Sequence, residues 1–237
     1  MTRAIFVAAG MAVVAVLLVG AQGRPDFSGT WDPAGRCFPN GETCPWKLEE
    51  IPINERAAAH RRTFDEVISP KYDCVPATTP GIVADPYMMR IEQRADRILI
   101  HYEKDDVTRT AWLDGRKPPI NEFTLQGFAT ARYDGATLVV ETTNFVYDPT
   151  GLDDMAGLPS SAQKKVVERY TREGNMLRAT VSTEDPLFLV APAVFSTSWR
   201  LAPAGARMEK YDCDPAEARQ PLQFLPPKYK QVRGAAR

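Results

Sequence analysis

The sequence predicts an all-β protein, built as one up-and-down β-barrel of about eight strands with a single helix before the barrel. Eight short segments between residues 87 and 213 alternate in polarity or are rich in β-branched residues, as strands are. Turn signals such as Asp134-Gly135 and Gly174-Asn175 separate these segments at the spacing of hairpins. Such a series favours a closed barrel, which can hold one small ligand, with a β-sandwich as the second choice.

The barrel is one of four expected parts of the chain. Residues 1–23 read as a signal peptide, 24–86 as a turn-rich segment with one helix over 53–68, 87–213 as the barrel core and 214–237 as a C-terminal tail. The expected strands are 88–93, 97–103, 108–113, 128–133, 136–145, 165–171, 176–183 and 196–201.

The signal-peptide assignment rests on the first 23 residues. Arg3 precedes an almost wholly apolar run over residues 4–20, and three small or polar residues follow at 21–23. An uncleaved membrane anchor is the alternative, but it needs about 20 apolar residues and this run is shorter. We therefore expect cleavage near Gly23 and a periplasmic or secreted protein without a stable membrane span.

Charge and cysteine content bound the partners and the compartment. Only Arg3 is charged within residues 1–23, so the 29 Lys and Arg of the chain fall to 28 against 30 Asp and Glu, a net charge of −2. This balance argues against binding to nucleic acid or to anionic lipid. The basic residues from Lys228 onward are typical of a solvated tail.

Four cysteines in an exported chain favour disulfides. Cys37 and Cys44 flank a turn, which makes a local bridge plausible and leaves Cys74 to pair with Cys213; the other pairings stay open. A four-cysteine zinc site is the competing interpretation, but the paired CxxC spacing is absent from the sequence. No metal site is expected.

Several strands carry a charged residue among apolar neighbours on the same face. Glu141, Glu168 and Arg109 have this pattern, and His101 and Glu184 extend it. Exposed strand charges or structural ion pairs are the simpler explanation for any one of them. Together they suggest a hydrogen-bonded network inside the barrel, because unpaired buried charges are very costly. We expect Glu141 to point inward.

Fixed catalytic motifs are absent from the sequence. It contains no GxSxG, P-loop, GxGxxG or HExxH, and its two histidines, His60 and His101, are far apart. Ser160-Ser161 has no histidine base nearby and is explained better as a polar loop. No cofactor is expected, and carboxylate, Arg or Tyr acid–base chemistry is the kind that needs no fixed spacing.

Several stretches resemble a family of exported bacterial lipocalin-like β-barrel proteins that are mostly uncharacterised. They are PDFSGTW at 25–31, CVP…PG at 74–81, YE…R…LDGR within 102–116, DGATLVVETTNF at 134–145, VVERY at 166–170 and TVSTEDP at 180–186. Relatives tend to have histidines where this chain has Ser160 and Lys165. Chemistry that relied on those histidines is therefore not expected here.

A weaker similarity is to lipocalins proper. Gly29-Thr30-Trp31 resembles their GxW start, whose Trp closes one barrel end and stacks on an Arg near the last strand. The resemblance implies that Trp31 and Arg200 are structural and lie together.

The predicted function is binding of a small, largely apolar molecule in the barrel lumen. The alternative is a cofactor-independent lyase, isomerase, cyclase or hydrolase that uses carboxylate acid–base chemistry in the same cavity. The expected catalytic residues are Glu141, Glu168 and Tyr170, and the expected ligand-binding residues are Arg109, Arg116, Asn144 and His101.

Overall fold

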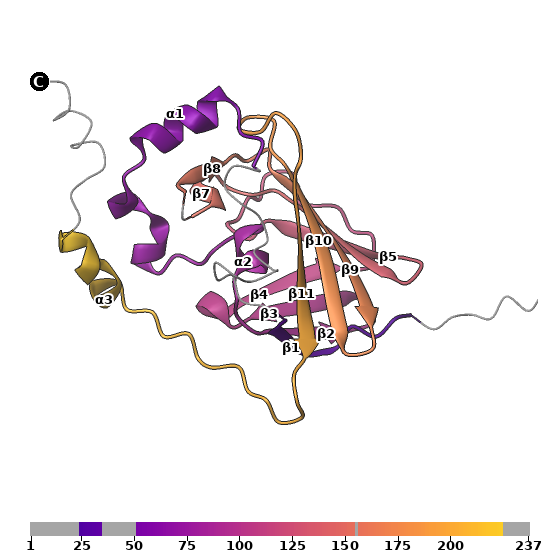
Figure 1. The fold of residues 1–237 in the computed structure, drawn as a ribbon. Helices are drawn as coiled ribbons and strands as arrows, with labels where there is room; N and C mark the ends of the chain where they lie inside the picture. The colour runs from indigo at the N-terminus through magenta and orange to yellow at the C-terminus, as the bar shows by residue number, and fades with distance from the viewer. Residues whose placement is uncertain (1–23, 35–50, 155, 225–237) are drawn as a thin grey trace, which may run out of the picture.

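The computed structural model describes residues 24–34, 51–154 and 156–224. In this part of the chain, nine strands close into a barrel in the order β1–β11–β10–β9–β6–β5–β4–β3–β2 (Figure 1). The strands are β1 Gly29–Pro33, β2 Met89–Gln93, β3 Arg97–Tyr102, β4 Val107–Trp112, β5 Phe128–Asp134, β6 Thr137–Thr143, β9 Lys165–Glu173, β10 Met176–Glu184 and β11 Ala193–Leu201. The predicted fold class and all eight expected strands are confirmed.

Two features depart from a simple up-and-down barrel. β1 is a ninth strand, and its Trp31 lies opposite Leu201 of β11 and Met89 of β2, so this short strand closes the barrel. β4 and β5 run parallel and pair over only two residue pairs. β5 begins beside the end of β4, with Ala129 opposite Ala111, so the connecting residues 113–127 loop back to that end and β5 continues in the direction of β4.

The inward faces of the strands form the main hydrophobic core. In β9, Val166, Glu168 and Tyr170 are buried while Val167 and Arg169 are not, as the two-residue period of a strand requires. The hairpin turns at Gly135 and Gly174 have φ of 58°, which suits glycine. The largest fully buried side chains of the barrel core include Trp31, Tyr170, Phe27, Phe145 and Met89.

The expected single helix over residues 53–68 is wrong in its extent. The structure has α1 at Glu55–Thr63, with the Asn54 side chain capping it, and then a separate 3₁₀ turn, η2, at Glu66–Ile68. Between them Phe64 is extended, and the Asp65 side chain accepts a hydrogen bond from the Val67 amide. Asp65 therefore starts a new turn instead of continuing the helix.

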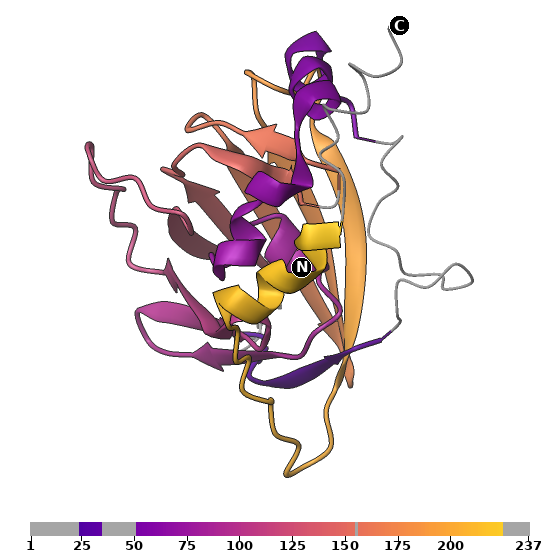
Figure 2. The same ribbon diagram turned by 90° about the vertical axis from the view of Figure 1, so that its left-hand side faces the viewer.

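One end of the barrel is covered, and we call it the covered end. β2, β4, β9 and β11 begin there, and its cover consists of the η3 turn (Pro70–Asp73), α2 (Gly81–Ala84), α1 and the two-stranded sheet of β7 (Asp148–Asp153) and β8 (Leu158–Ser160) (Figures 1 and 2). A second hydrophobic cluster, which includes Ile51, Leu152, Leu158 and Phe188, packs α1, β7 and β8 together.

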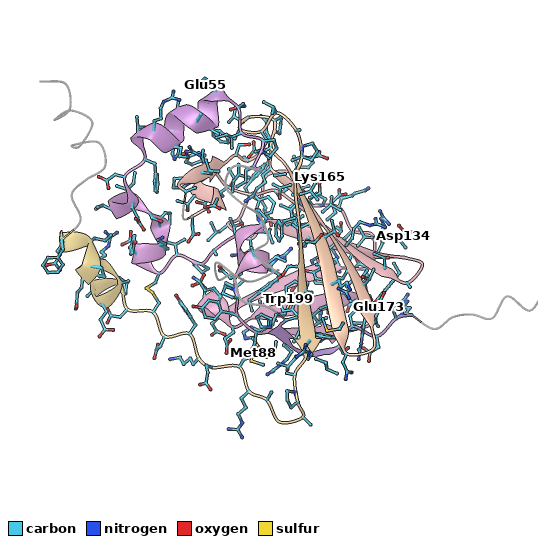
Figure 3. The ribbon with its side chains drawn as sticks, in the orientation of Figure 1. Glu55, Met88, Asp134, Lys165, Glu173 and Trp199 are labelled. Atoms are coloured by element: carbon cyan, nitrogen blue, oxygen red, sulfur yellow. A yellow bond between two sulfur atoms is a disulfide. The ribbon has the colours of Figure 1, made fainter. Side chains whose placement is uncertain are left out.

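The C-terminal segment is tied back to the cover. After β11 the chain runs along the outside to α3 (Pro215–Arg219) and η5 (Gln220–Phe224), and Cys213 forms a disulfide with Cys74 (Figure 3). The predicted Cys74–Cys213 bridge is thus confirmed, with the two Cα atoms 5.8 Å apart. Cys37, Cys44, the expected signal peptide and the basic tail lie outside the described residues. Among the helices described, none has the length and apolar character needed to cross a membrane.

Candidate functional site

A buried ion pair lies in the middle of the barrel. Arg109 of β4 and Glu168 of β9 form two parallel hydrogen bonds, Nη2 to Oε1 at 2.6 Å and Nη1 to Oε2 at 3.2 Å. Their side chains are 2% and 0% exposed. Both were expected in an internal network, and the structure confirms that position.

Three hydroxyl groups complete this network. Arg109 donates to the Tyr102 hydroxyl and to Thr142 Oγ1, both at 3.0 Å, and the Tyr170 hydroxyl donates to Glu168 Oε2 at 2.5 Å. Burial raises the pKa of Tyr102 to about 12 and raises that of Tyr170 well above its ordinary value. Burial alone would lower the pKa of the Arg109 guanidinium. The adjacent Glu168 carboxylate raises this pKa by a larger amount, so the net shift is upward.

We call the group formed by Arg109, Glu168, Tyr102, Thr142 and Tyr170 the central network. It is a structural ion pair with its hydrogen-bond partners rather than an open binding site. Its charges compensate each other and the tyrosines stay protonated. A ligand would have to displace fully buried groups to reach Glu168. The predicted catalytic roles of Glu168 and Tyr170 consequently require an opening of the barrel.

The expectation that Glu141 points inward is wrong. The neighbours Val140 and Thr142 are fully buried, whereas the Glu141 carboxylate lies on the outer face, 47% exposed, 3.0 Å from Lys165 Nζ. β6 buries three consecutive residues, Leu138 to Val140. Apolar and polar residues therefore do not alternate along its sequence, and the sequence does not show which face points inward. Glu141 and Glu168 thus lie on opposite sides of the barrel wall and cannot share one cavity.

The other predicted ligand-binding residues also lie outside the central network. His101 is partly exposed and its Nδ1 lies 2.9 Å from Thr108 Oγ1. Arg116 is exposed, pairs with Asp114 and lies over the Trp112 ring. Asn144 adopts a φ of 59° and donates to the carbonyls of Pro119 and Glu122, which fastens the 113–127 segment. Glu184 is exposed as well.

The predicted Trp31–Arg200 contact is replaced by another. Trp31 is fully buried and donates from Nε1 to the Phe27 carbonyl at 3.0 Å, as a structural residue should. The guanidinium over its ring belongs to Arg172, 5.1 Å from the ring centroid, whereas Arg200 is exposed. Successive residues of a strand point to opposite faces. The preceding residue of β11, Trp199, is buried, so Arg200 points outward.

A pocket of about 260 Å³ lies at the covered end, outside the central network; we call it the end pocket. One wall comes from residues 70–86, the second from β7, and Lys104 and Asp105 of η4 (Lys104–Asp106) complete it. Apolar surface comes from Val75, Pro76 and Leu152.

Asp85 is a partly buried carboxylate of the end pocket without a hydrogen-bond donor among the described residues. Asp154, which also lines the pocket, is exposed and lies 3.9 Å from Lys71 Nζ. Asp85 lies directly after α2. Burial raises its pKa to about 7, Lys104 opposes this, and Asp154 and Asp105 add to it. A carboxyl group with a shifted pKa in a pocket that combines apolar and charged lining is a candidate for recognition or proton transfer.

Two other acidic groups of the pocket, Asp105 and Asp148, accept hydrogen bonds. Asp105 accepts from the Ala77 amide at 2.7 Å and from Lys104 Nζ at 3.1 Å, which joins η4 to the first wall. Asp148 accepts from the amide and the hydroxyl of Thr150. Asp85 is thereby distinguished from these two neighbours. Among the described residues, no group of three or more His, Cys, Asp or Glu is placed to hold a metal ion.

Sequence reasoning missed the end pocket because it joins short, irregular segments. Asp85 stands beside Pro86 in a proline-rich stretch that reads only as a loop. The buried Lys164 stands beside the exposed Lys165, and nothing in the pair Lys164-Lys165 separates them. Ser160 and Ser161, expected in a polar loop, are also buried.

Comparisons with known proteins add little. A scan against models of protein families found no match, and a search of curated proteins found none. Among solved structures, the chain is similar to the fluorescent protein UnaG. The N57A mutant has a TM-score of 0.36 at 14% identity, over 75% of this chain and 96% of UnaG. The wild type has a TM-score of 0.34 at 13% identity, over 74% and 97%. Scores this low support no inference about ligand or activity, so membership of the lipocalin-like family stays a prediction.

Proposed function

We propose that this protein binds a small molecule in the end pocket, and that the ligand combines an apolar body with a positively charged N–H group. The observation that carries the proposal is Asp85, a carboxylate without a hydrogen-bond donor among the described residues that lines a pocket of mixed apolar and acidic character. The predicted function is kept in its general form, a barrel that binds a small molecule, but its site moves from the lumen to the covered end.

The size and charge of the end pocket support this ligand class. A volume of about 260 Å³ lies just below the range of about 300–1,000 Å³ typical of drug-sized ligands, so the ligand is small. A cation next to Asp85 stabilises the charged carboxylate that burial destabilises. Val75, Pro76 and Leu152 offer apolar contact to the rest of the molecule.

Benzylamine and benzyl alcohol form a suitable pair of probes, since they share size and ring but differ in charge. By isothermal titration calorimetry at pH 8, we expect benzylamine to bind at least about tenfold more tightly, because Asp85 is then ionised. Asp85→Asn removes this preference, whereas Asp114→Asn, which changes an exposed carboxylate outside the pocket, preserves it. Equal affinity for both probes in the wild type, or an unchanged preference in Asp85→Asn, contradicts the proposal.

A cofactor-independent enzyme in the same pocket is the second candidate. The specific observation in its favour is that burial brings the pKa of Asp85 to about 7, which suits a general acid or base at neutral pH. On this alternative Asp85 takes the role predicted for Glu141 and Glu168. The test is mass spectrometry of a co-purifying molecule. Its chemical conversion by the wild type but not by Asp85→Asn supports catalysis, and its recovery unchanged from both favours binding alone.

We also propose export to the periplasm or the medium. The layout of residues 1–23 supports it, and the Cys74–Cys213 disulfide fits an oxidising compartment. Expression of the full chain followed by N-terminal sequencing of the periplasmic protein tests this directly. A start near Arg24 supports cleavage, and a protein retained in the cytoplasm with its first residues intact contradicts it.

A further inference from the structure

A groove of about 520 Å³ lies on the outer face of the barrel wall, across β6, β9, β10 and β11; we call it the outer groove. Its lining residues are Thr137, Arg169, Thr171, Arg178, Ala179, Thr180, Ser196, Thr197 and Ser198. Each of these described residues except Ala179 carries a side-chain hydrogen-bond donor, and none of them is acidic. The described helices lie away from β9, β10 and β11 (Figure 1).

Strand register arranges the polar side chains of the outer groove in two rows across β9, β10 and β11. One row consists of Thr171, Arg178 and Ser198, and the next consists of Arg169, Thr180 and Ser196. On one face of a sheet, directly opposed Cβ atoms are about 4.5–5.5 Å apart and diagonal neighbours about 7–8 Å apart. Arg169 and Arg178 are diagonal neighbours, so one ligand can contact both rows.

The two guanidinium groups of the outer groove are not balanced by carboxylates. Arg169 lies 2.8 Å from Asp134, and both side chains are about half exposed. Arg178 is exposed and forms no ion pair or side-chain hydrogen bond with any described residue. One carboxylate therefore serves two neighbouring guanidinium groups, on a chain whose net charge is −1. A guanidinium binds phosphate-like oxyanions through paired, charge-assisted hydrogen bonds, so this local positive charge favours an anion.

The hydroxyl groups of the outer groove indicate what accompanies the anion. Only Thr180 and Ser196 contact each other through their hydroxyl oxygens, at 3.4 Å, and the other lining hydroxyls form no side-chain hydrogen bond within the described residues. Hydroxyl groups both donate and accept, which matches the hydroxyl groups of a sugar. A volume of about 520 Å³ falls within the range of about 300–1,000 Å³ for small-molecule sites and exceeds what a lone oxyanion fills.

We propose that the outer groove binds a sugar that carries a phosphate or sulfate group. The oxyanion lies at Arg178, with Arg169 beside it, and the sugar hydroxyls contact the Ser and Thr side chains of the two rows. This is a second site, because the outer groove and the end pocket have no lining residue in common. Its occupation does not depend on the ligand of Asp85.

Isothermal titration calorimetry at low ionic strength tests the proposal with glucose 6-phosphate, glucose 6-sulfate, glucose and inorganic phosphate. At least one of the two esters should bind at least about tenfold more tightly than either glucose or inorganic phosphate, and the better ester identifies the preferred oxyanion. Arg178→Gln should weaken binding of that ester at least about tenfold. Arg90→Gln removes the same charge from an exposed position of β2 and should change it less than about twofold.

Two further variants separate recognition from a general effect of charge. Asp134→Asn removes the carboxylate that competes for Arg169 and should strengthen binding of the ester about threefold or more. Thr180→Val combined with Ser196→Ala removes two hydroxyls and should lower the affinity for the ester to that for inorganic phosphate. These positions lie on the exposed strand surface, where substitutions leave folding nearly unchanged.

Esters that bind no more tightly than glucose, or no more tightly than inorganic phosphate, overturn the proposal. Equal weakening in Arg178→Gln and Arg90→Gln overturns it as well, because only the net charge would then matter. Asp85→Asn should leave binding of the ester unchanged, since Asp85 lies outside the outer groove. A failure of benzylamine to bind therefore concerns the proposed function alone.

Discussion

Glu141 and Glu168 share a residue type and a strand setting but have opposite surroundings. Glu168 is fully buried with Arg109 and Tyr170, and Glu141 is exposed with Lys165. The sequence pattern identified a charged network inside the barrel and two of its members, Arg109 and Glu168. It placed Glu141 on the wrong face, because β6 buries residues on both of its faces.

The two glutamates should respond very differently to the same substitution. Glu168→Gln leaves the buried Arg109 without its counter-charge, and we expect the free energy of unfolding to fall by about 3–5 kcal/mol. Glu141→Gln removes one exposed ion pair and should cost less than about 1 kcal/mol. Urea unfolding at pH 7 measures both. Equal losses in the two variants would show that Glu168 is not the buried partner.

At the scale of elements, strands were the most predictable part of the fold. Their alternation and the turns at Gly135 and Gly174 located all eight expected strands. β1 was missed because five residues between turn-forming stretches carry too little pattern, although the GxW resemblance pointed to Trp31. Most of the cover was not predictable, because apart from α1 it is assembled from 3₁₀ turns, a four-residue helix and a short two-stranded sheet.

The contact of β1 with the rest of the barrel gives a prediction about Arg172. Its guanidinium lies over the Trp31 ring and donates to the Asp26 carbonyl at 2.6 Å. Arg172→Ala should lower the free energy of unfolding by about 1–2 kcal/mol, because both contacts are lost. Arg200→Ala, the matched control on the exposed face of β11, should change it by less than about 0.5 kcal/mol. Thermal or urea unfolding distinguishes them, and a larger effect from Arg200 would restore the contact implied by the lipocalin resemblance.

For the molecule as a whole, the disulfide links the cover to the end of the chain. Cys74 and Cys213 are 139 residues apart, so the bridge restricts a long loop in the unfolded chain. Replacing both by Ser should lower the free energy of unfolding by about 4 kcal/mol. Urea unfolding of the double variant against the oxidised wild type checks this. The pairing was predictable only because four cysteines with one expected local pair leave a single remaining combination.

The pH dependence of stability provides a second test on the whole molecule. The folded pKa of Asp85 lies near 7, above its ordinary value of 3.8, so the folded state holds more protons between pH 4 and 7. The contribution of Asp85 to stability is present below pH 4 and is lost as the pH rises through 7. The free energy of unfolding of Asp85→Asn should therefore exceed that of the wild type by about 1–2 kcal/mol at pH 8. At pH 4 the two free energies of unfolding should be equal. A variant that is less stable at pH 8 would mean that Asp85 has a stabilising partner.

We expect Asp85 to bind a cationic ligand in the end pocket, and the affinity of the protein for benzylamine should therefore depend on pH. Benzylamine remains charged between pH 6 and 8, whereas Asp85 passes from mostly protonated to mostly ionised. Calorimetry should show about a tenfold gain in wild-type affinity from pH 6 to 8, and none in Asp85→Asn. An affinity that is the same at both pH values, or a gain that persists in Asp85→Asn, would contradict the account.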